Sequence, residues 1–472
     1  MALLRVTPRV RTILPICLLA VFTAMYGMAW FTPAVGLAYS DGAFLVTALT
    51  HKVDATPPLF PALLALFALI SRQAQWLKLA PLACTVLWLA MTKRLLTKMG
   101  ASQECAWMLV VMTAASPTVL YLGTGLFAEP LFAILATAGL LALLDEKPLA
   151  AGVCAGLATV TMTAGAPLIA ACVLTLVANR RLRSAVVFTC ASIVFAAPWL
   201  GWSLAHGGIP ASRLHLSELA VLLGNNAMLL AASPFTLLTG YPSLYPGLLT
   251  AVALLIVLVR QRHFVPDLFV GFYCMMLLWR TEPPLHAFVP VLPMFLWMLW
   301  RVARRGRPKT VTKAVAILMI VPALWFSARR VASGTTLGAV TAETARPDNW
   351  HEMETLFAFI RANTPQDAVL LADLDPVFYL NTGRATVRGF TPDSFRNYYA
   401  PGGTLVTPDQ LHAAMLRDRV SYVVLTPDAD LPESASFHKA AAALERGGLL
   451  EPVSVPGASG EYRILRVAQR QE

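Results

Sequence analysis

Residues 104–144, ECAWMLVVMTAASPTVLYLGTGLFAEPLFAILATAGLLALL, decide the fold class because they contain two long apolar runs, 104–122 and 127–144. Each run has about the length that crosses the hydrocarbon core of a membrane. The charged residues of this stretch, Glu104 and Glu129, both stand near the end of a run. A helix on the surface of a soluble protein needs a polar face, which these runs lack. The stretch therefore predicts two membrane spans joined by a short turn.

The rest of the chain has the same apolar character. Its 472 residues are 57% hydrophobic and 13% charged, and its mean hydropathy is +0.63. This composition excludes an ordinary soluble globule and a disordered chain. Runs of sufficient length predict eleven spans, at 12–30, 77–92, 104–122, 127–144, 149–162, 164–179, 184–204, 245–260, 265–281, 285–301 and 311–327. The run 57–71 is short and rich in Pro, so we expect an interfacial or re-entrant helix there, with a twelfth span as the alternative.

The net charge of +11 comes from 37 Lys and Arg against 26 Asp and Glu. The basic residues stand in short clusters between apolar runs, which indicates membrane topology and not nucleic-acid binding. With eleven spans, five clusters fall on one side, predicted to be cytoplasmic: Arg5–Arg11, Lys93–Lys98, Arg180–Arg183, Arg260–Arg262 and Arg301–Lys309. The sequence thus predicts a multi-pass protein of a bacterial inner (plasma) membrane, with a cytoplasmic N-terminus, an uncleaved first span in preference to a signal peptide, and an external C-terminus.

Composition changes near residue 331, where long apolar runs stop and Pro, Asp, Arg and Asn become frequent. We therefore expect a transmembrane domain over 1–330 and a soluble extracytoplasmic α/β domain over 331–472. The second part alternates helix-like segments with strand-like runs. The helices are expected at 348–363, 407–419 and 435–447, and the strands at 368–373, 420–425 and 461–467.

Ionisable residues near the membrane are costly and often functional. Asp41, Glu129, Arg280 and His286 stand at or just beyond span ends, and the predicted topology puts all four on the external side. Each also has a structural interpretation: Asp41 caps a short helix, Glu129 benefits from a helix dipole, and Arg280 reaches toward lipid head groups. His286 either assists the chemistry or packs.

External cations are candidate phosphate ligands. A guanidinium such as that of Arg280 binds two phosphate oxygens at once, and Lys52, Arg329 and Arg330 are further external cations. The chain has no HExxH, Cys/His cluster, GxGxxG or GxxxxGK[ST] motif. The sequence therefore identifies no resident cofactor and leaves a divalent metal open. The apolar piece 217–232 is expected to form a lid or interfacial helix over the site, or a passive connector.

Four motifs resemble the GT-C-type membrane glycosyltransferases, the group of the protein mannosyltransferases, the aminoarabinose transferase of lipid A and the Rgt-type lipopolysaccharide transferases. They are SDGAFLVTAL (40–49), TPPLFPALLALF (56–67), GLFAEPLFAIL (125–135) and the stretch from Arg280 to Pro293. In order and spacing they cover nearly the whole chain. The resemblance implies a GT-C-like bundle, mainly α-helical and polytopic, with a small external α/β domain.

The resemblance also implies a reaction. A sugar on a polyprenyl-phosphate carrier is passed to a lipid, glycan or protein acceptor in contact with membrane lipid. Asp41 would be the base or acceptor orienter, and Glu129 a second carboxylate near the site. Arg280, with Lys52 or His286, would neutralise the leaving phosphate.

Two positions depart from the pattern of the family. Met162 stands where many relatives have an arginine, and Thr56 stands where the PPL motif is often preceded by a lysine. Either other cations form the phosphate site, or the chain has lost activity. A membrane transporter and a non-catalytic membrane assembly protein are the alternative functions, although a transporter is expected to carry ionisable groups near mid-membrane.

Overall fold

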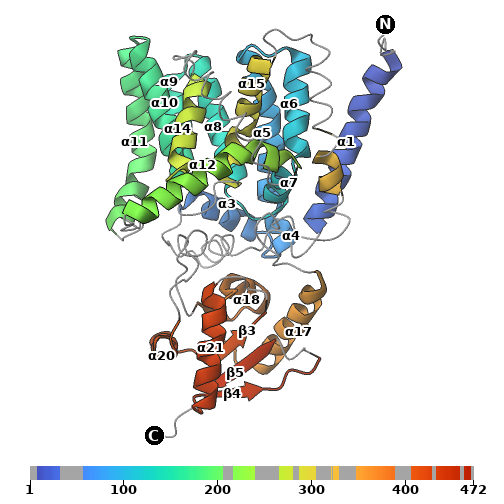
Figure 1. The fold of residues 1–472 in the computed structure, drawn as a ribbon, viewed down its shortest axis with the longest axis vertical. Helices are drawn as coiled ribbons and strands as arrows, with labels where there is room; N and C mark the ends of the chain where they lie inside the picture. The colour runs from blue at the N-terminus through green and yellow to red at the C-terminus, as the bar shows by residue number, and fades with distance from the viewer. Residues whose placement is uncertain are drawn as a thin grey trace.

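The computed structural model describes residues 8–31, 57–205, 216–239, 265–279, 286–303, 320, 323–328, 347–388, 406–427, 432–457 and 462–468. A bundle of apolar helices makes up the larger part, and a smaller α/β unit lies at one end of it (Figure 1). The first helix, α1 (Pro8–Phe31), begins at the end of the bundle that is remote from the α/β unit.

The bundle helices follow the predicted apolar runs closely. They are α3 (Leu59–Ala68), α4 (Ala74–Leu77), α5 (Leu79–Lys98), α6 (Gln103–Ala115), α7 (Pro117–Thr124), α8 (Glu129–Leu144), α9 (Pro148–Thr161), α10 (Ala166–Ala178), α11 (Leu182–Ala205), α12 (Leu216–Thr239), α14 (Val265–Leu277) and α15 (Leu292–Ala303), with the 3₁₀ turns η1 (Thr163–Gly165) and η2 (His286–Val291).

The predicted span 104–122 is broken, because α6 and α7 meet at an angle of 68°. Ser116 is extended, and its hydroxyl accepts a hydrogen bond from the N–H of Val119 at 3.4 Å. Pro117 follows at the first turn of α7, where its missing N–H costs no helical bond. Ser116 and Pro117 therefore end one helix and begin the next inside a continuous apolar run.

Length and composition identify Gln75–Lys98 and Leu182–Ala205 as helices able to cross a membrane, and the bent pair α6–α7 as a third. Helices α8, α9, α10 and α14 are apolar but shorter. The count of eleven spans stays a prediction, since 245–260 and most of 311–327 lie outside the described residues. Helix α3 has 10 residues, which is too short to cross a bilayer and fits the predicted interfacial or re-entrant helix.

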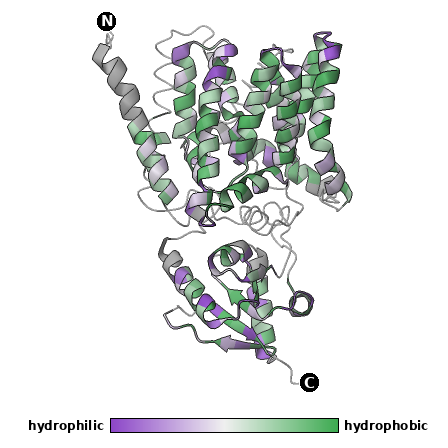
Figure 2. Ribbon diagram, turned by 180° about the vertical axis from the view of Figure 1, so that it is seen from behind, coloured by the Kyte–Doolittle hydropathy of each residue, from purple (hydrophilic) through white to green (hydrophobic). Residues whose placement is uncertain are grey.

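Apolar side chains cover the outside of the bundle. On α11, Leu182, Val186 and Val194 are each more than 60% exposed, and Figure 2 shows hydrophobic residues along most of the bundle helices. Exposed apolar surface of this kind is unfavourable in water and normal against lipid. The bundle is therefore built to contact a membrane.

Helices α9 and α11 pack closely because α9 presents glycines to α11. A Cβ atom at Gly152 would lie 2.4 Å from the carbonyl oxygen of Phe188, and one at Gly156 would lie 2.7 Å from that of Ser192. The Ser192 hydroxyl donates to the Gly152 carbonyl at 3.1 Å. Small residues four apart allow helices in membranes to approach in this way.

We expect Gly152→Ala to destabilise the protein, because the added methyl group must push against backbone atoms. A loss of about 1–3 kcal/mol is typical of such overpacking. Gly201, on α11, is the matched control, since a Cβ there meets no atom within 4 Å. Thermal unfolding in detergent should show a lower Tm for Gly152→Ala and an equal or higher Tm for Gly201→Ala. Equal melting of both variants would refute this helix contact.

Ion pairs join the helix ends at the bundle end remote from the α/β unit. Asp145, which follows α8, pairs with Lys98 and with Arg94, the latter at 3.2 Å. Arg181, before α11, pairs with Glu146 at 2.8 Å. Two of the basic clusters predicted to be cytoplasmic thus lie at one end of the bundle.

The C-terminal unit contains one sheet of five strands in the part of the chain that the structure describes, in the order β2-β1-β3-β5-β4. β1 is parallel to β2 and β3, and β5 is antiparallel to β3 and β4. Its elements are α17 (Pro347–Asn363), β1 (Val369–Ala372), α18 (Asp375–Thr382), β2 (Ala385–Val387), α20 (Pro408–Arg417), β3 (Tyr422–Leu425), α21 (Pro432–Arg446), β4 (Leu450–Val453) and β5 (Arg463–Val467). The expected helices and strands are all present, and α18, β2 and β4 are additions to them.

Helices cover both faces of this sheet. Along β1 the side chains alternate, so that Leu371 packs with α20 and α21, whereas Leu370 and Ala372 pack with α17 and α18. The unit is thus a three-layer α/β/α structure. It contacts the bundle through α18, whose Tyr379 and Leu380 pack against an apolar cluster of α3, α4 and α5 that includes Phe60, Leu64, Leu77 and Ala80.

Candidate active site

A short buried turn, 125–128, lies between α7 and α8 and organises the end of the bundle next to the C-terminal unit. Leu126 and Ala128 belong to the apolar cluster that α18 contacts. The Phe127 ring packs against the ring of Tyr121 of α7 in a tilted arrangement, with ring centroids 4.7 Å apart. The turn is therefore fixed from both sides, and the residues that flank it are held in place.

Glu129 follows this turn directly and is the first residue of α8. Pro130 fits the first helical turn, and the positive end of the helix dipole favours a carboxylate at this position. The side chain is partly exposed. Glu129 thus has the partly exposed, electrostatically favoured placement that acid–base chemistry or substrate orientation needs.

His286 lies beside the same turn. It begins η2, and its ring centroid is 6.3 Å from that of Phe127 and 5.9 Å from that of Tyr121. The Tyr273 hydroxyl fixes η2 by donating to the Ala287 carbonyl at 2.7 Å. The structure therefore brings two of the predicted site residues, Glu129 and His286, to one place although 157 positions of sequence separate them.

Lys78 is a functional candidate that the sequence prediction missed. It stands directly before α5 and is 0% exposed. Its neighbours Leu77 and Ala80 pack with Leu126 and Ala128, so Lys78 lies at the level of the turn before Glu129. A buried cation at the end of a membrane helix is costly and marks a functional position by default. The signal in the sequence was a single lysine at the start of an apolar run.

The other predicted site residues lie outside the described residues: Asp41, Lys52, Arg280, Arg329 and Arg330. Their roles stay predictions. Met162, one of the two positions at which the sequence departs from the GT-C pattern, directly follows α9 and packs on the apolar cluster around Leu126, beside the same turn.

Helix α12 is longer than the predicted piece 217–232, with 24 residues, and runs obliquely across the bundle (Figure 1). Asn226 is fully buried, and its amide donates to the Leu278 carbonyl at 3.0 Å. The Ser116 hydroxyl donates to the Leu237 carbonyl. These two bonds attach α12 to the bundle. The bond to Leu278 lies two residues before Arg280 in the chain. Whether α12 acts as a lid stays a prediction.

No cluster of three or more His, Cys, Asp or Glu side chains suited to a metal ion occurs within the described ranges. The question of a divalent metal stays open, since Asp41 lies outside those ranges.

No protein-family model matches the chain, and no curated protein matches it. Among solved structures, ArnT from Cupriavidus metallidurans bound to undecaprenyl phosphate is similar over 97% of this chain and 99% of that chain, with a TM-score of 0.58 and 12% identity. The chain therefore shares the fold of ArnT. ArnT in the apo state gives a TM-score of 0.50 at 12% identity, over 95% of this chain and 97% of that one. Mycobacterial arabinofuranosyltransferase AftD gives 0.47 at 19% identity, over 96% of this chain and 40% of the larger AftD chain.

Proposed function

We propose that this protein transfers a sugar from a polyprenyl-phosphate-linked donor to a hydroxyl group of a lipid, glycan or protein at the extracytoplasmic membrane face. The observation that carries the proposal is the likeness to ArnT bound to undecaprenyl phosphate, which extends over nearly the full length of both chains. The placement of Glu129 and His286 beside one turn, at the bundle end that meets the C-terminal unit, supports it.

In the proposed reaction the acceptor hydroxyl loses its proton to Asp41 and attacks the anomeric carbon of the donor sugar. The bond from this carbon to the phosphate oxygen breaks, and polyprenyl phosphate leaves with the electron pair. Glu129 orients the acceptor or the sugar from the N-terminus of α8. A base within hydrogen-bond reach of the attacking hydroxyl contributes about 10²–10⁴-fold to such a reaction.

Cations stabilise the leaving phosphate as its charge develops. The proposed set is Arg280 with Lys52 or His286, and Arg329 and Arg330 are a second external pair. Lys78 joins this set, because it is a buried cation beside the turn that precedes Glu129. It offers a positive charge near the site in a chain that has Thr56 where the GT-C pattern often has a lysine.

We expect Lys78→Met to impair use of the donor. Loss of a charge-assisted hydrogen bond to phosphate corresponds to about 30-fold in kcat/KM for the lipid-phosphate sugar. Lys78→Arg, which keeps the charge, should retain more activity. Both variants are compared in a transfer assay with purified protein in nanodiscs, and their Tm values are measured to exclude unfolding. Wild-type donor kinetics in a folded Lys78→Met protein would remove Lys78 from the phosphate site.

A further inference from the structure

The sheet of the C-terminal unit has a point where its connections diverge. From β1 the chain passes through α18, on one face, to β2; from β2 it passes through α20, on the other face, to β3. β1 and β3 are therefore parallel neighbours whose crossovers leave in opposite directions. In open α/β sheets, ligands bind outside the carboxyl ends of the strands at such a point.

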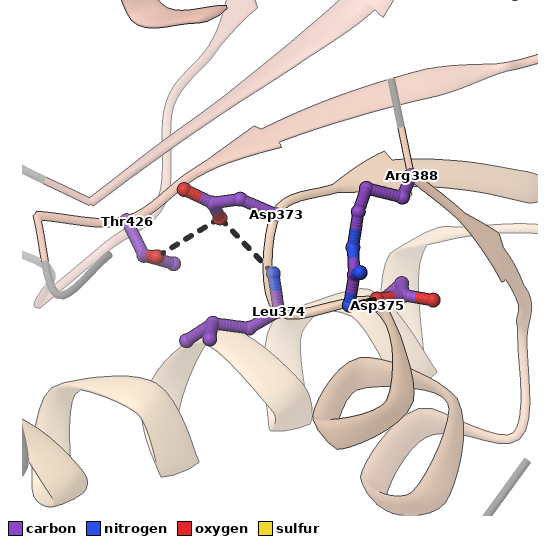
Figure 3. A network of polar contacts seen from close by, with 5 residues as sticks. All are labelled: Asp373, Leu374, Asp375, Arg388 and Thr426. Atoms are coloured by element: carbon purple, nitrogen blue, oxygen red, sulfur yellow. Dashed lines mark hydrogen bonds and ion pairs between the residues drawn. The ribbon is translucent and has the colours of Figure 1, made fainter. Parts of the chain in front are cut away.

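Two buried polar residues stand at these carboxyl ends. Asp373 follows β1, Thr426 follows β3, and both are 0% exposed. As Figure 3 shows, one carboxylate oxygen of Asp373, Oδ1, accepts from the Thr426 hydroxyl at 3.3 Å and from the Leu374 N–H at 3.1 Å. The side chain of Asp373 is thus fixed in one orientation by its Oδ1 atom.

The other carboxylate oxygen, Oδ2, is buried without a hydrogen bond. The atom opposite it is Nε2 of His438, on α21, which is also buried without a hydrogen bond. The two atoms are 3.7 Å apart, which is too far for a direct hydrogen bond. A hydroxyl group between them can donate to Oδ2 and accept from an N–H at Nε2. This arrangement satisfies two groups whose burial is otherwise costly.

Charge at this edge of the sheet selects the class of ligand. Asp375 is paired with Arg388 at 2.6 Å, so its charge is balanced (Figure 3). Burial raises the pKa of the Asp375 carboxyl group, against the opposing effect of Arg388. The polar atoms that are left without a hydrogen bond, Oδ2 of Asp373 and Nε2 of His438, suit a hydroxyl group, which both donates and accepts. A neutral ligand rich in hydroxyl groups, such as a sugar ring, fits these side chains.

The helix after β1 also joins the unit to the bundle. Helix α18 begins two residues after Asp373, and its Tyr379 and Leu380 pack against the cluster that contains Leu126 and Ala128. The helix that follows Asp373 therefore contacts the bundle close to the turn before Glu129.

We propose that Asp373, Thr426 and His438 form a carbohydrate-binding site that holds a neutral sugar residue of the acceptor above the bundle. The use of this site in catalysis rests on the proposed transferase function, whereas the binding itself does not. The glycan is bound through its hydroxyl groups, and no covalent step takes place at this site.

The test is glycan binding by the full-length protein in nanodiscs, on an array of neutral and acidic oligosaccharides with no lipid-phosphate donor present. Wild type should bind at least one neutral glycan, and Asp373→Asn and His438→Gln should each weaken binding about tenfold, equivalent to about 1.4 kcal/mol. Asp418→Asn is the control, since Asp418 pairs with the exposed Arg417 on the same unit. Tm values show whether each variant is folded.

The outcomes separate this inference from the transferase proposal. Glycan binding that the two site variants weaken supports the site even if no transfer is detected. A wild type that binds no neutral glycan, or folded site variants that bind as wild type does, would overturn it. In a working transfer assay the site variants should raise the KM for the acceptor and leave the KM for the donor unchanged.

Discussion

Asp41→Asn should lower sugar transfer by at least about a thousandfold, because an amide accepts no proton from the acceptor hydroxyl. Asparagine has almost the same size and can still cap a helix, so membrane insertion and yield should not change. The measurement is single-turnover transfer of a labelled sugar from its polyprenyl-phosphate carrier by the purified protein.

Glu129→Gln is the comparison for this experiment. Glu129 is proposed to orient the substrate, so its loss should cost less, about 10- to 100-fold. Both variants should melt like wild type. Full turnover by Asp41→Asn would exclude Asp41 as the base. A larger loss for Glu129→Gln than for Asp41→Asn would indicate that Glu129 is the base and that Asp41 orients the substrate.

Arg301→Met should have the largest effect on stability. Asp267, in the first turn of α14, is 0% exposed, and the Arg301 guanidinium at the end of α15 contacts both of its oxygens, at 2.6 and 2.7 Å. Removing the arginine leaves a buried carboxylate without its counter-ion, which typically costs about 3–5 kcal/mol. Thermal unfolding in detergent should show a strongly lowered Tm.

The double variant Arg301→Met, Asp267→Leu is the matched control. Replacing a buried ion pair with apolar groups of similar volume is often neutral or stabilising, so much of the lost stability should return. A single variant that melts like wild type would show that this pair does not hold α14 against α15. A double variant less stable than the single one would contradict the explanation by an unpaired charge.

The positions of most helices could be predicted because an apolar run of membrane length forms a helix in lipid, where each backbone polar group must be bonded within the segment. Strands with dense apolar residues could also be predicted, such as 420–425, which contains β3 (Tyr422–Leu425). In contrast, β2 (Ala385–Val387) and β4 (Leu450–Val453) are short and have no clear alternation, so pairing within the sheet creates them.

The bend between α6 and α7 was missed for a different reason. Hydropathy reports the length of an apolar run and not its direction, and the run 104–122 is apolar throughout. The local chemistry of Ser116 and Pro117 carried the information, as a cap followed by a residue suited to the first turn of a helix.

For the site, the sequence predicted Glu129 and His286 on one side of the membrane, and the structure places both beside the turn 125–128; their roles stay predictions. A single lysine at the start of an apolar run was too weak a signal to indicate Lys78, because its burial depends on packing against the turn before Glu129. The sequence also could not indicate the pairing of Asp373 with Thr426, since 53 positions separate them and the order of the strands brings them together.

The most direct test of the central claim uses purified wild-type protein in nanodiscs with a panel of labelled polyprenyl-phosphate sugars and membrane lipid, glycan and protein acceptors. The account predicts that one donor is consumed, that its sugar appears on an acceptor, and that free polyprenyl phosphate is released in equal amount. Consumption of no donor by folded wild-type protein, or release of polyprenyl phosphate at the same rate from Asp41→Asn, would contradict it.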